Sequence, residues 1–194
     1  RRDLKKSVYR EIILRKMLPI CFPFSSFWVR QIVREEIDAA VDAGKGDESD
    51  PAFTGMLFGF MFARIEEPVQ LGNEWICHSK WVQRDHAADP FDAFTKPTNN
   101  RSMLYFCEMM ECIQGTEWAA KVPAELPVYN IGGDLDPVGS WGEGVYQTTS
   151  LLASTGHKVC TRLYSGYRHE IHNYDEIKCE VEKGIIDFFA SCLA

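Results

Sequence analysis

Residues 126–139 read LPVYNIGGDLDPVG, a short apolar run that ends in two glycines and continues into an acidic loop. Such a run, bounded by turn-forming residues, is typical of a buried strand. Residues 143–155 show a helical pattern and are followed by a glycine, and residues 158–164 alternate apolar with polar side chains, which predicts a second strand. A last helix is predicted over 174–193. Strand, helix, strand and helix in succession indicate a parallel α/β unit.

The chain before this unit is predicted to be mainly helical. The spacing of apolar residues predicts helices over 3–18, from Ser25 or Ser26 to Ala40, over 51–63 and over 100–114, with a loop over 44–50. The first of these helices is basic and amphipathic. Such a helix is compatible with transient contact with a membrane surface, although a solvated face is the more ordinary interpretation.

Composition excludes several classes of protein. The 194 residues carry a net charge of −7 and are 45% apolar, which describes a globular chain and argues against a nucleic-acid binder. No apolar run approaches the roughly 20 residues that a membrane span needs. The seven cysteines are scattered without a CxxC pair, so we expect buried free thiols in a reducing, cytoplasmic compartment, with no structural metal. No cofactor is predicted.

An acid and a histidine follow the two predicted strands. Asp134 and Asp136 lie in the loop after the first strand, and His169 lies in the loop after the second. Because the carboxyl ends of neighbouring parallel strands meet at one edge of a sheet, Asp136 and His169 are predicted to meet there. A carboxylate so placed holds an imidazole in one tautomer and stabilises the imidazolium during catalysis. Asp134 is expected to serve the turn itself.

A zinc protease is excluded by the same loop. His169 and His172 are three residues apart in a predicted loop, whereas the HExxH motif needs two histidines four apart on a helix.

These loops resemble a known family. The segments GGDLDPVG (132–139), GV (144–145) and LYSGYRHEIHN (163–173) are similar to the last third of α/β-hydrolases in the serine aminopeptidase, monoacylglycerol lipase and lysophospholipase-like branch. Upstream, WIC (75–77) and DPFDAF (89–94) resemble part of the cap of those enzymes. The resemblance implies that residues 1–121 form a helical cap or lid and that residues 122–194 form the C-terminal hydrolase segment.

Two positions depart from the family pattern. His78 and Ser79 stand where the cap usually has Arg-Asp, so a charge pair there is expected to be lost, and Tyr174 replaces a glutamate. The family also places its serine in a G-x-S-x-G elbow that precedes the acid, and no such motif occurs in the sequence. The resemblance therefore implies a chain without the early strands and the nucleophile, either a truncated form of a whole enzyme or a genuine short product.

The resemblance implies a serine hydrolase that cleaves carboxylic esters, with a lysophospholipid or a monoacylglycerol as the expected substrate. His169 is the expected base and Asp136 its orienting acid; without the nucleophile the chain alone is expected to be inactive. Phe58, Met61 and Phe62 are expected to line an acyl-chain pocket, together with apolar neighbours Phe53, Met56, Leu57 and Phe60, although a cap packed on its own core would look the same. Two alternatives stay open: a non-catalytic module that binds an apolar ligand or a protein, and a hydrolase with Asp or Cys as its nucleophile.

Overall fold

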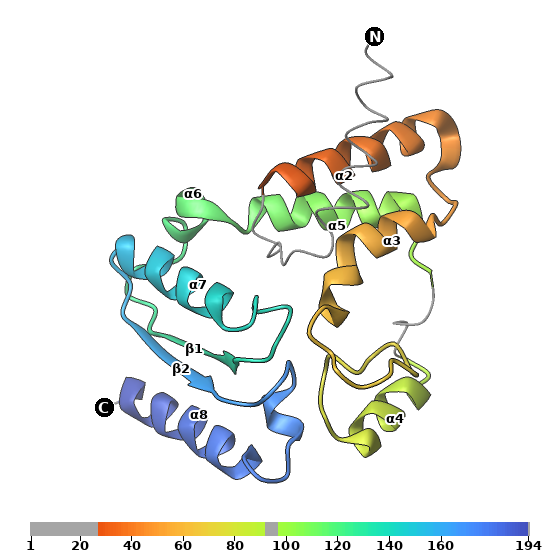
Figure 1. Ribbon diagram of the computed structural model, residues 1–194. Coiled ribbons are helices and arrows are strands. Elements are labelled where there is room, and N and C mark those ends of the chain that lie inside the picture. Colours follow the sequence, from red (N-terminus) through yellow and green to blue (C-terminus); the bar gives the residue numbers. More distant parts are fainter. Residues whose placement is uncertain (1–26, 92–96, 194) are drawn as a thin grey trace. The chain divides into compact units, whose positions relative to one another are not determined.

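The computed structural model describes residues 27–91 and 97–193, which divide into two compact units. The first unit contains residues up to 66 and residues 96–108, and the second contains residues 67–95 and 109–194. Each unit is considered by itself (Figure 1). The predicted helix over 3–18 and the cap at Ser25 or Ser26 lie outside the described residues.

The first unit is helical. It contains α2 (Phe27–Ala40), which continues into the π-helical η2 (Val41–Lys45), α3 (Pro51–Phe58), the 3-10 helix η3 (Gly59–Phe62) and the start of α5 (Asn100–Cys112). Proline at the first position and the Asp50 side chain, which accepts the Ala52 N–H at 2.8 Å, explain where α3 begins. The helical conformation is interrupted at Gly44, whose φ of 82° is left-handed, which is where the loop over 44–50 was predicted to begin.

The core of this unit joins α2, α3 and α5. The buried side chains at every third or fourth position make one cluster, as the helical periodicity predicts. Its members are Val33, Ile37, Phe53, Leu57, Met103, Leu104 and Cys107.

The second unit contains the predicted α/β arrangement. Strand β1 (Val128–Gly133) pairs in parallel with β2 (Val159–Tyr164), with Val128 opposite Val159 and Gly133 opposite Tyr164. Helix α7 (Glu143–Ser154) connects the strands, and α8 (Lys178–Leu193) follows the second one. The two helices lie on opposite sides of the strand pair (Figure 1). The predicted strand–helix–strand–helix order is thus confirmed.

Alternating side chains of β1 explain how both helices pack. Asn130 faces α7, where its Nδ2 donates to the Val145 carbonyl at 2.8 Å and to the Thr149 hydroxyl at 3.0 Å. Its neighbour Tyr129 stacks on Phe188 of α8, with 5.2 Å between ring centroids. Successive strand residues point to opposite faces, so one strand anchors a helix on each side.

Three details differ from the sequence-based expectation. Helix α8 begins at Lys178 rather than Tyr174, because Ile171–Asn173 form a separate 3-10 turn (η4) and Tyr174 is extended. Two short helices, α4 (Lys80–Ala88) and α6 (Gly115–Ala119), were not predicted, since few of their residues are buried and the apolar pattern is weak.

The expected boundary at residue 121 does not separate the two units, because residues 67–95 and 109–121 belong to the second unit with the strands. Hydrogen bonds explain this grouping: segment 67–78 contacts the loop after β2 through Arg168, Glu170 and Tyr174. The assignment of residues 1–121 as a cap stays a prediction.

Cysteine burial also differs from expectation. The six cysteines in the described part of the chain are free, but only Cys77 and Cys107 are buried; the exposed ones are Cys112, Cys160, Cys179 and Cys192. Scattered cysteines were expected in the core, and most of them are instead on solvent-facing positions of helices and of β2.

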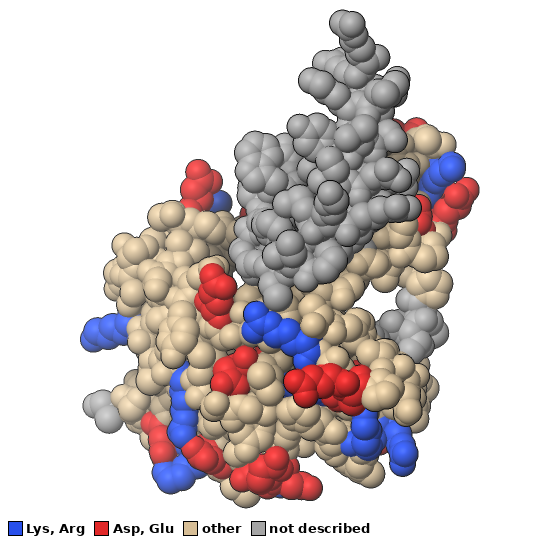
Figure 2. All heavy atoms as spheres, in the orientation of Figure 1, with Lys and Arg blue, Asp and Glu red and all other residues tan. Residues whose placement is uncertain are grey.

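The surface carries both signs of charge. On the face drawn in Figure 2, acidic and basic side chains of the described residues are interspersed, without a continuous basic patch. Among residues 27–91 and 97–193, no helix combines the length and the apolar character that a bilayer crossing requires.

Candidate active site

The loop after β1 holds the acid. Two backbone N–H groups at the start of this loop donate to carbonyls at the end of β2 and in the loop after it. That of Asp134 donates to Tyr164 at 3.1 Å, and that of Leu135 donates to Tyr167 at 2.9 Å. Further along, Ser140 and Trp141 both adopt positive φ, at 51° and 53°, which is unusual for residues with a side chain. The start of the loop is therefore bound to its neighbour, and the rest is closed by hydrogen bonds within the loop, such as that from the Trp141 N–H to the Asp136 carbonyl at 2.7 Å.

Asp134 joins the two loops. Its Oδ2 accepts from the Ser165 hydroxyl at 2.7 Å, and its Oδ1 accepts from the Gly166 N–H at 2.6 Å. The sequence predicted a turn-forming role for Asp134 in its own loop, but the carboxylate instead organises the turn of the next loop.

Asp136 and His169 are in contact. The Nδ1 atom of His169 lies 3.1 Å from Oδ2 of Asp136, while Oδ1 of Asp136 accepts the Val138 N–H at 2.8 Å. The Asp136 side chain is 9% exposed, whereas that of His169 is 39% exposed. Because an ionised carboxylate can only accept a hydrogen bond, the proton of the neutral imidazole lies on Nδ1. The other nitrogen, Nε2, is then unprotonated and can act as a base.

The surroundings of His169 make it more basic. The hydrogen bond that His169 donates to Asp136 raises the pKa of His169 above its ordinary value, against an opposing effect of partial burial. The indole of Trp75 lies beside the imidazole, with 5.1 Å between ring centroids. The ring is thus held by a carboxylate at one nitrogen and by an aromatic neighbour on its side.

Segment 67–78 holds the histidine loop from another direction. The guanidinium of Arg168 donates to both carboxylate oxygens of Glu67, at 2.6 and 2.9 Å, and to the Glu74 carbonyl at 2.7 Å. The hydrogen bond from Arg168 lowers the pKa of Glu67 to about 2. The Glu170 N–H donates to the Ile76 carbonyl at 2.9 Å. Residues on both sides of His169 are therefore fixed to this segment.

The Glu74 side chain shapes the same segment from within. Its carboxylate accepts three backbone N–H groups, those of Gln70, Leu71 and Gly72, at 2.6, 2.8 and 3.0 Å. These hydrogen bonds close the turn that presents the Glu74 carbonyl to Arg168, and the side chain is fully buried.

The two departures from the family pattern contact each other. The hydroxyl of Tyr174 accepts the backbone N–H groups of His78 and Arg168, both at 3.1 Å, and lies 3.2 Å from Nδ1 of His78. Burial raises the pKa of Tyr174, and burial followed by the charge of Arg168 lowers that of His78. The sequence signalled only a lost charge pair at position 78; a neutral hydrogen-bonded pair takes its place.

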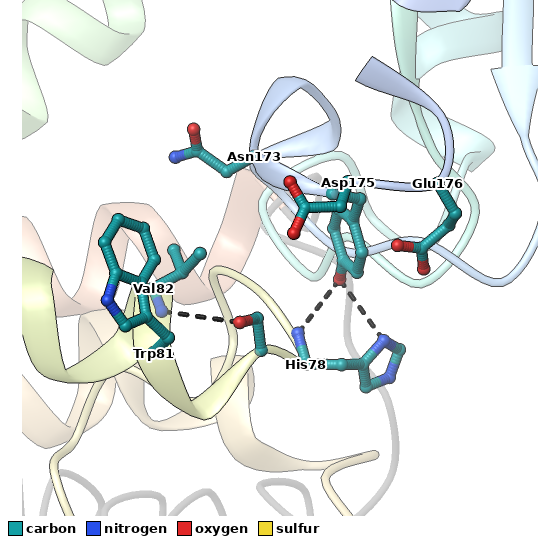
Figure 3. A pocket seen from close by; sticks show the side chains of 8 residues that line it. His78, Trp81, Val82, Asn173, Asp175 and Glu176 are labelled. Carbon is teal, nitrogen blue, oxygen red and sulfur yellow. Dashed lines mark hydrogen bonds between the residues drawn. The ribbon is translucent and has the colours of Figure 1, made fainter. Parts of the chain in front are cut away.

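A pocket of about 370 Å³ opens beside this pair (Figure 3). Its walls come from the start of α4 and from the chain that follows η4, and neither Asp136 nor His169 lines it. The lining residues are His78, Ser79, Trp81, Val82, Asn173, Tyr174, Asp175 and Glu176.

The proposed acyl-pocket residues belong to the first unit. Met61 is buried, Phe62 is half-buried, and Phe58 packs against the core of that unit with its ring 5.5 Å from Phe106. The side chain of Met56 lies outside the described part of the structure. A role for Phe58, Met61 and Phe62 in substrate binding stays a prediction.

Comparison with solved structures yields two matches. A highly thermostable carboxyl esterase from Bacillus coagulans, crystallised with glycerol, superposes with a TM-score of 0.80 and 47% sequence identity over 85% of this chain. A lipase in its open form superposes with a TM-score of 0.72 and 28% identity over 81% of this chain. Both are α/β-hydrolases. This chain is a partial α/β-hydrolase.

The match is to part of each relative. The chain spans about half the length of both structures, 53% of the esterase and 50% of the lipase. It corresponds to the C-terminal part of the α/β-hydrolase fold, as the resemblance of its two loops implied. No protein-family model and no curated protein matches the sequence.

Proposed function

We propose that this chain supplies the acid and the base of a serine hydrolase that cleaves carboxylic esters. The observation that carries the proposal is the hydrogen bond between Asp136 and His169 at the carboxyl ends of two paired parallel strands. The two similar structures are a carboxyl esterase and a lipase, which supports an ester as the substrate.

In the proposed reaction His169 acts twice. Its Nε2 takes the proton of a serine hydroxyl while the serine oxygen attacks the ester carbonyl carbon. The imidazolium that forms is stabilised by Asp136, and it then gives its proton to the departing alcohol as the C–O bond breaks. In the second half a water molecule attacks the acyl-serine carbonyl carbon while Nε2 takes one of its protons. His169 then returns this proton to the serine oxygen as the acyl–serine bond breaks and the carboxylic acid leaves. Asp136 stays ionised and fixes the Nδ1–H tautomer.

The serine would come from outside residues 1–194, because the sequence contains no G-x-S-x-G motif. We expect residues 1–194 alone not to turn over esters, since His169 would have no hydroxyl to activate.

The proposed substrate is a lipid ester, either a lysophospholipid or a monoacylglycerol. The resemblance of the two loops to the lysophospholipase-like branch and the similarity to a lipase support this choice. The apolar side chains Phe58, Met61 and Phe62 are of the kind that contacts an acyl chain.

A chimera tests the catalytic assignment. The N-terminal part of the Bacillus coagulans esterase, which this chain does not match, would be joined ahead of it, and the product assayed with p-nitrophenyl esters and with lipid esters. We expect hydrolysis, and we expect His169→Ala to reduce kcat by about 10³-fold or more. His172→Ala is the matched control, because His172 is an exposed histidine in the same loop, and it should keep the activity.

Labelling by a fluorophosphonate probe would show independently that the supplied serine is assembled in the chimera. A labelled chimera in which His169→Ala hydrolyses esters at the original rate would refute the proposed role of His169. Hydrolysis of p-nitrophenyl esters without hydrolysis of monoacylglycerol or lysophospholipid would refute the lipid substrate and leave the ester hydrolase.

A further inference from the structure

Arg168 precedes the proposed base and points its charge into the protein. Its side chain is 6% exposed, yet it makes three hydrogen bonds, two to the Glu67 carboxylate and one to the Glu74 carbonyl. The paired oxygens and nitrogens form the fork-to-fork arrangement that only arginine offers. The two partners are 101 residues apart in the sequence, so this ion pair closes a long loop.

Only one partner of this ion pair is buried, since the Arg168 side chain is 6% exposed and that of Glu67 is 29% exposed. Such a pair is a weak source of net stability, because taking the guanidinium out of water costs about as much as the attraction between the charges returns. What such a pair does supply is a fixed geometry, because both carboxylate oxygens and two guanidinium nitrogens must align. The low pKa of Glu67, about 2, keeps this geometry in place at any ordinary pH.

The geometry reaches His169 through one peptide unit on each side. On one side of His169, the Arg168 side chain is held by Glu67 and Glu74, and the Arg168 N–H is accepted by the Tyr174 hydroxyl. On the other side, the Glu170 N–H is accepted by the Ile76 carbonyl. The His169 ring between them faces Asp136 on one side and Trp75 on another. Because the backbone at 168–170 is fixed, the imidazole has little freedom to leave the carboxylate.

We propose that Arg168 is a positioning residue: its ion pair with Glu67 holds His169 so that Nδ1 faces Asp136 and Nε2 is presented to the reacting hydroxyl. Arg168 itself touches neither substrate nor reacting atoms. A contribution of Arg168 to catalysis rests on the proposed function, whereas its effect on the orientation of the His169 ring does not. The positioning role and the proposed function can therefore be tested separately.

The test uses ¹⁵N NMR of the histidine side chains in residues 1–194. In the unmodified chain we expect the neutral His169 ring to carry its proton on Nδ1. Asp136→Asn sets the reference for a lost carboxylate. Arg168→Lys keeps the charge but loses the fork, so an effect of charge alone is excluded. We expect it to move His169 to a mixture of both tautomers. The matched control is Arg162→Lys, at the exposed pair of Arg162 with Glu180, which should leave the tautomer unchanged.

Glu67→Gln gives a second readout, because the amide keeps the shape and one acceptor while removing the charge. We expect a smaller shift of the His169 tautomer than for Arg168→Lys. Folded variants whose His169 tautomer equals that of the unmodified chain would overturn the proposal. Loss of folding in both variants would also overturn it, since the pair would then be needed for stability and not for positioning.

In the chimera, Arg168→Lys is expected to lower kcat by about 10- to 100-fold with KM little changed, as misplacement of a catalytic group does. A tautomer shift in the isolated chain together with full activity of the His169→Ala chimera would refute the proposed function and leave the positioning role. An unshifted tautomer together with an inactive His169→Ala chimera would refute the positioning role of Arg168 and leave the proposed function.

Discussion

Gly133 and Tyr167 are in such close contact that a side chain on Gly133 has no room. A Cβ atom at Gly133 would overlap the carbonyl oxygen of Tyr167 and would lie 2.6 Å from that of Arg168. These are backbone atoms of the histidine loop, which cannot rotate away as a side chain would. The absent side chain therefore lets the loop after β2 approach the end of β1, and this approach brings His169 to Asp136.

Gly133→Ala is expected to destabilise the second unit by about 1–3 kcal/mol or more, because overpacking must displace backbone. The Asp136–His169 contact should be lost with it. Urea unfolding followed by tryptophan fluorescence measures the first effect, and the His169 side-chain NMR signals measure the second.

The same substitution at Gly55 is the control. Gly55 lies in α3 and its Cβ would meet nothing within 4 Å, so Gly55→Ala should stabilise its helix by up to about 1 kcal/mol. Equal effects of the two substitutions would contradict the account of Gly133.

The contact between Asp136 and His169 makes stability depend on pH. The pKa of His169 is raised in the folded chain, mainly by the hydrogen bond that it donates to Asp136. A group of this kind stabilises the fold fully below its unfolded pKa, about 6.5, and this stabilisation is lost as the pH rises through the raised folded value. The difference in unfolding free energy between the unmodified chain and Asp136→Asn should thus be larger at pH 6 than at pH 9.

Asp134→Asn is the matched control for this measurement, because the same change is made two positions earlier, at a carboxylate that accepts from Ser165 and Gly166. Its effect should not follow the titration of His169. A difference for Asp136→Asn that stays constant from pH 6 to pH 9 would show that the two side chains do not share a proton contact in solution.

Much of the second unit was predictable because its signals are local. The apolar run over 128–131, the glycines that end it and the alternation over 158–164 each lie within a few residues, and parallel strands bring their carboxyl ends to one edge. The meeting of Asp136 and His169 follows from that rule, and the structure contains the contact. Their catalytic roles stay a proposal.

The surroundings of His169 were not predictable, because they depend on contacts between distant segments. Glu67 is 101 residues from Arg168, and His78 is 96 residues from Tyr174. Segment 67–78 has neither helical nor strand periodicity, so nothing in its pattern shows where it packs.

The predicted burial of the cysteines was wrong for a different reason. Burial of Cys is a tendency of the residue type and does not fix single positions, and Cys179 and Cys192 lie on the solvent-facing side of helix α8.

Asp134 is expected to act on the loop alone. Asp134→Ala removes the acceptor of both the Ser165 hydroxyl and the Gly166 N–H, so we expect a loss of about 1–2 kcal/mol in unfolding free energy. Ser165→Ala removes one of these two hydrogen bonds and should cost less. Neither should alter the His169 tautomer. A change of the His169 tautomer in Ser165→Ala, measured by NMR, would contradict a purely structural role for Asp134 beside the proposed catalytic role of Asp136.

The Tyr174 hydroxyl joins segment 67–78 to the histidine loop. It accepts two backbone N–H groups from segments far apart in the chain, and the residue is 3% exposed. Tyr174→Phe keeps the ring and removes only the hydroxyl, which leaves the N–H groups of His78 and Arg168 without their acceptor and the His78 ring without its partner. Because an unsatisfied buried donor costs about 1–3 kcal/mol, we expect the unfolding free energy to fall by about 2–4 kcal/mol. Hydrogen exchange should also speed up at the His78 and Arg168 amides first.

Tyr146→Phe is the control, at a 56% exposed position on α7, and should change the unfolding free energy by less than about 0.5 kcal/mol. Equal stability of the two variants would mean that water replaces the hydroxyl without loss, and that the hydrogen bonds of Arg168 and of the Glu170 N–H are enough to hold segment 67–78 to the histidine loop.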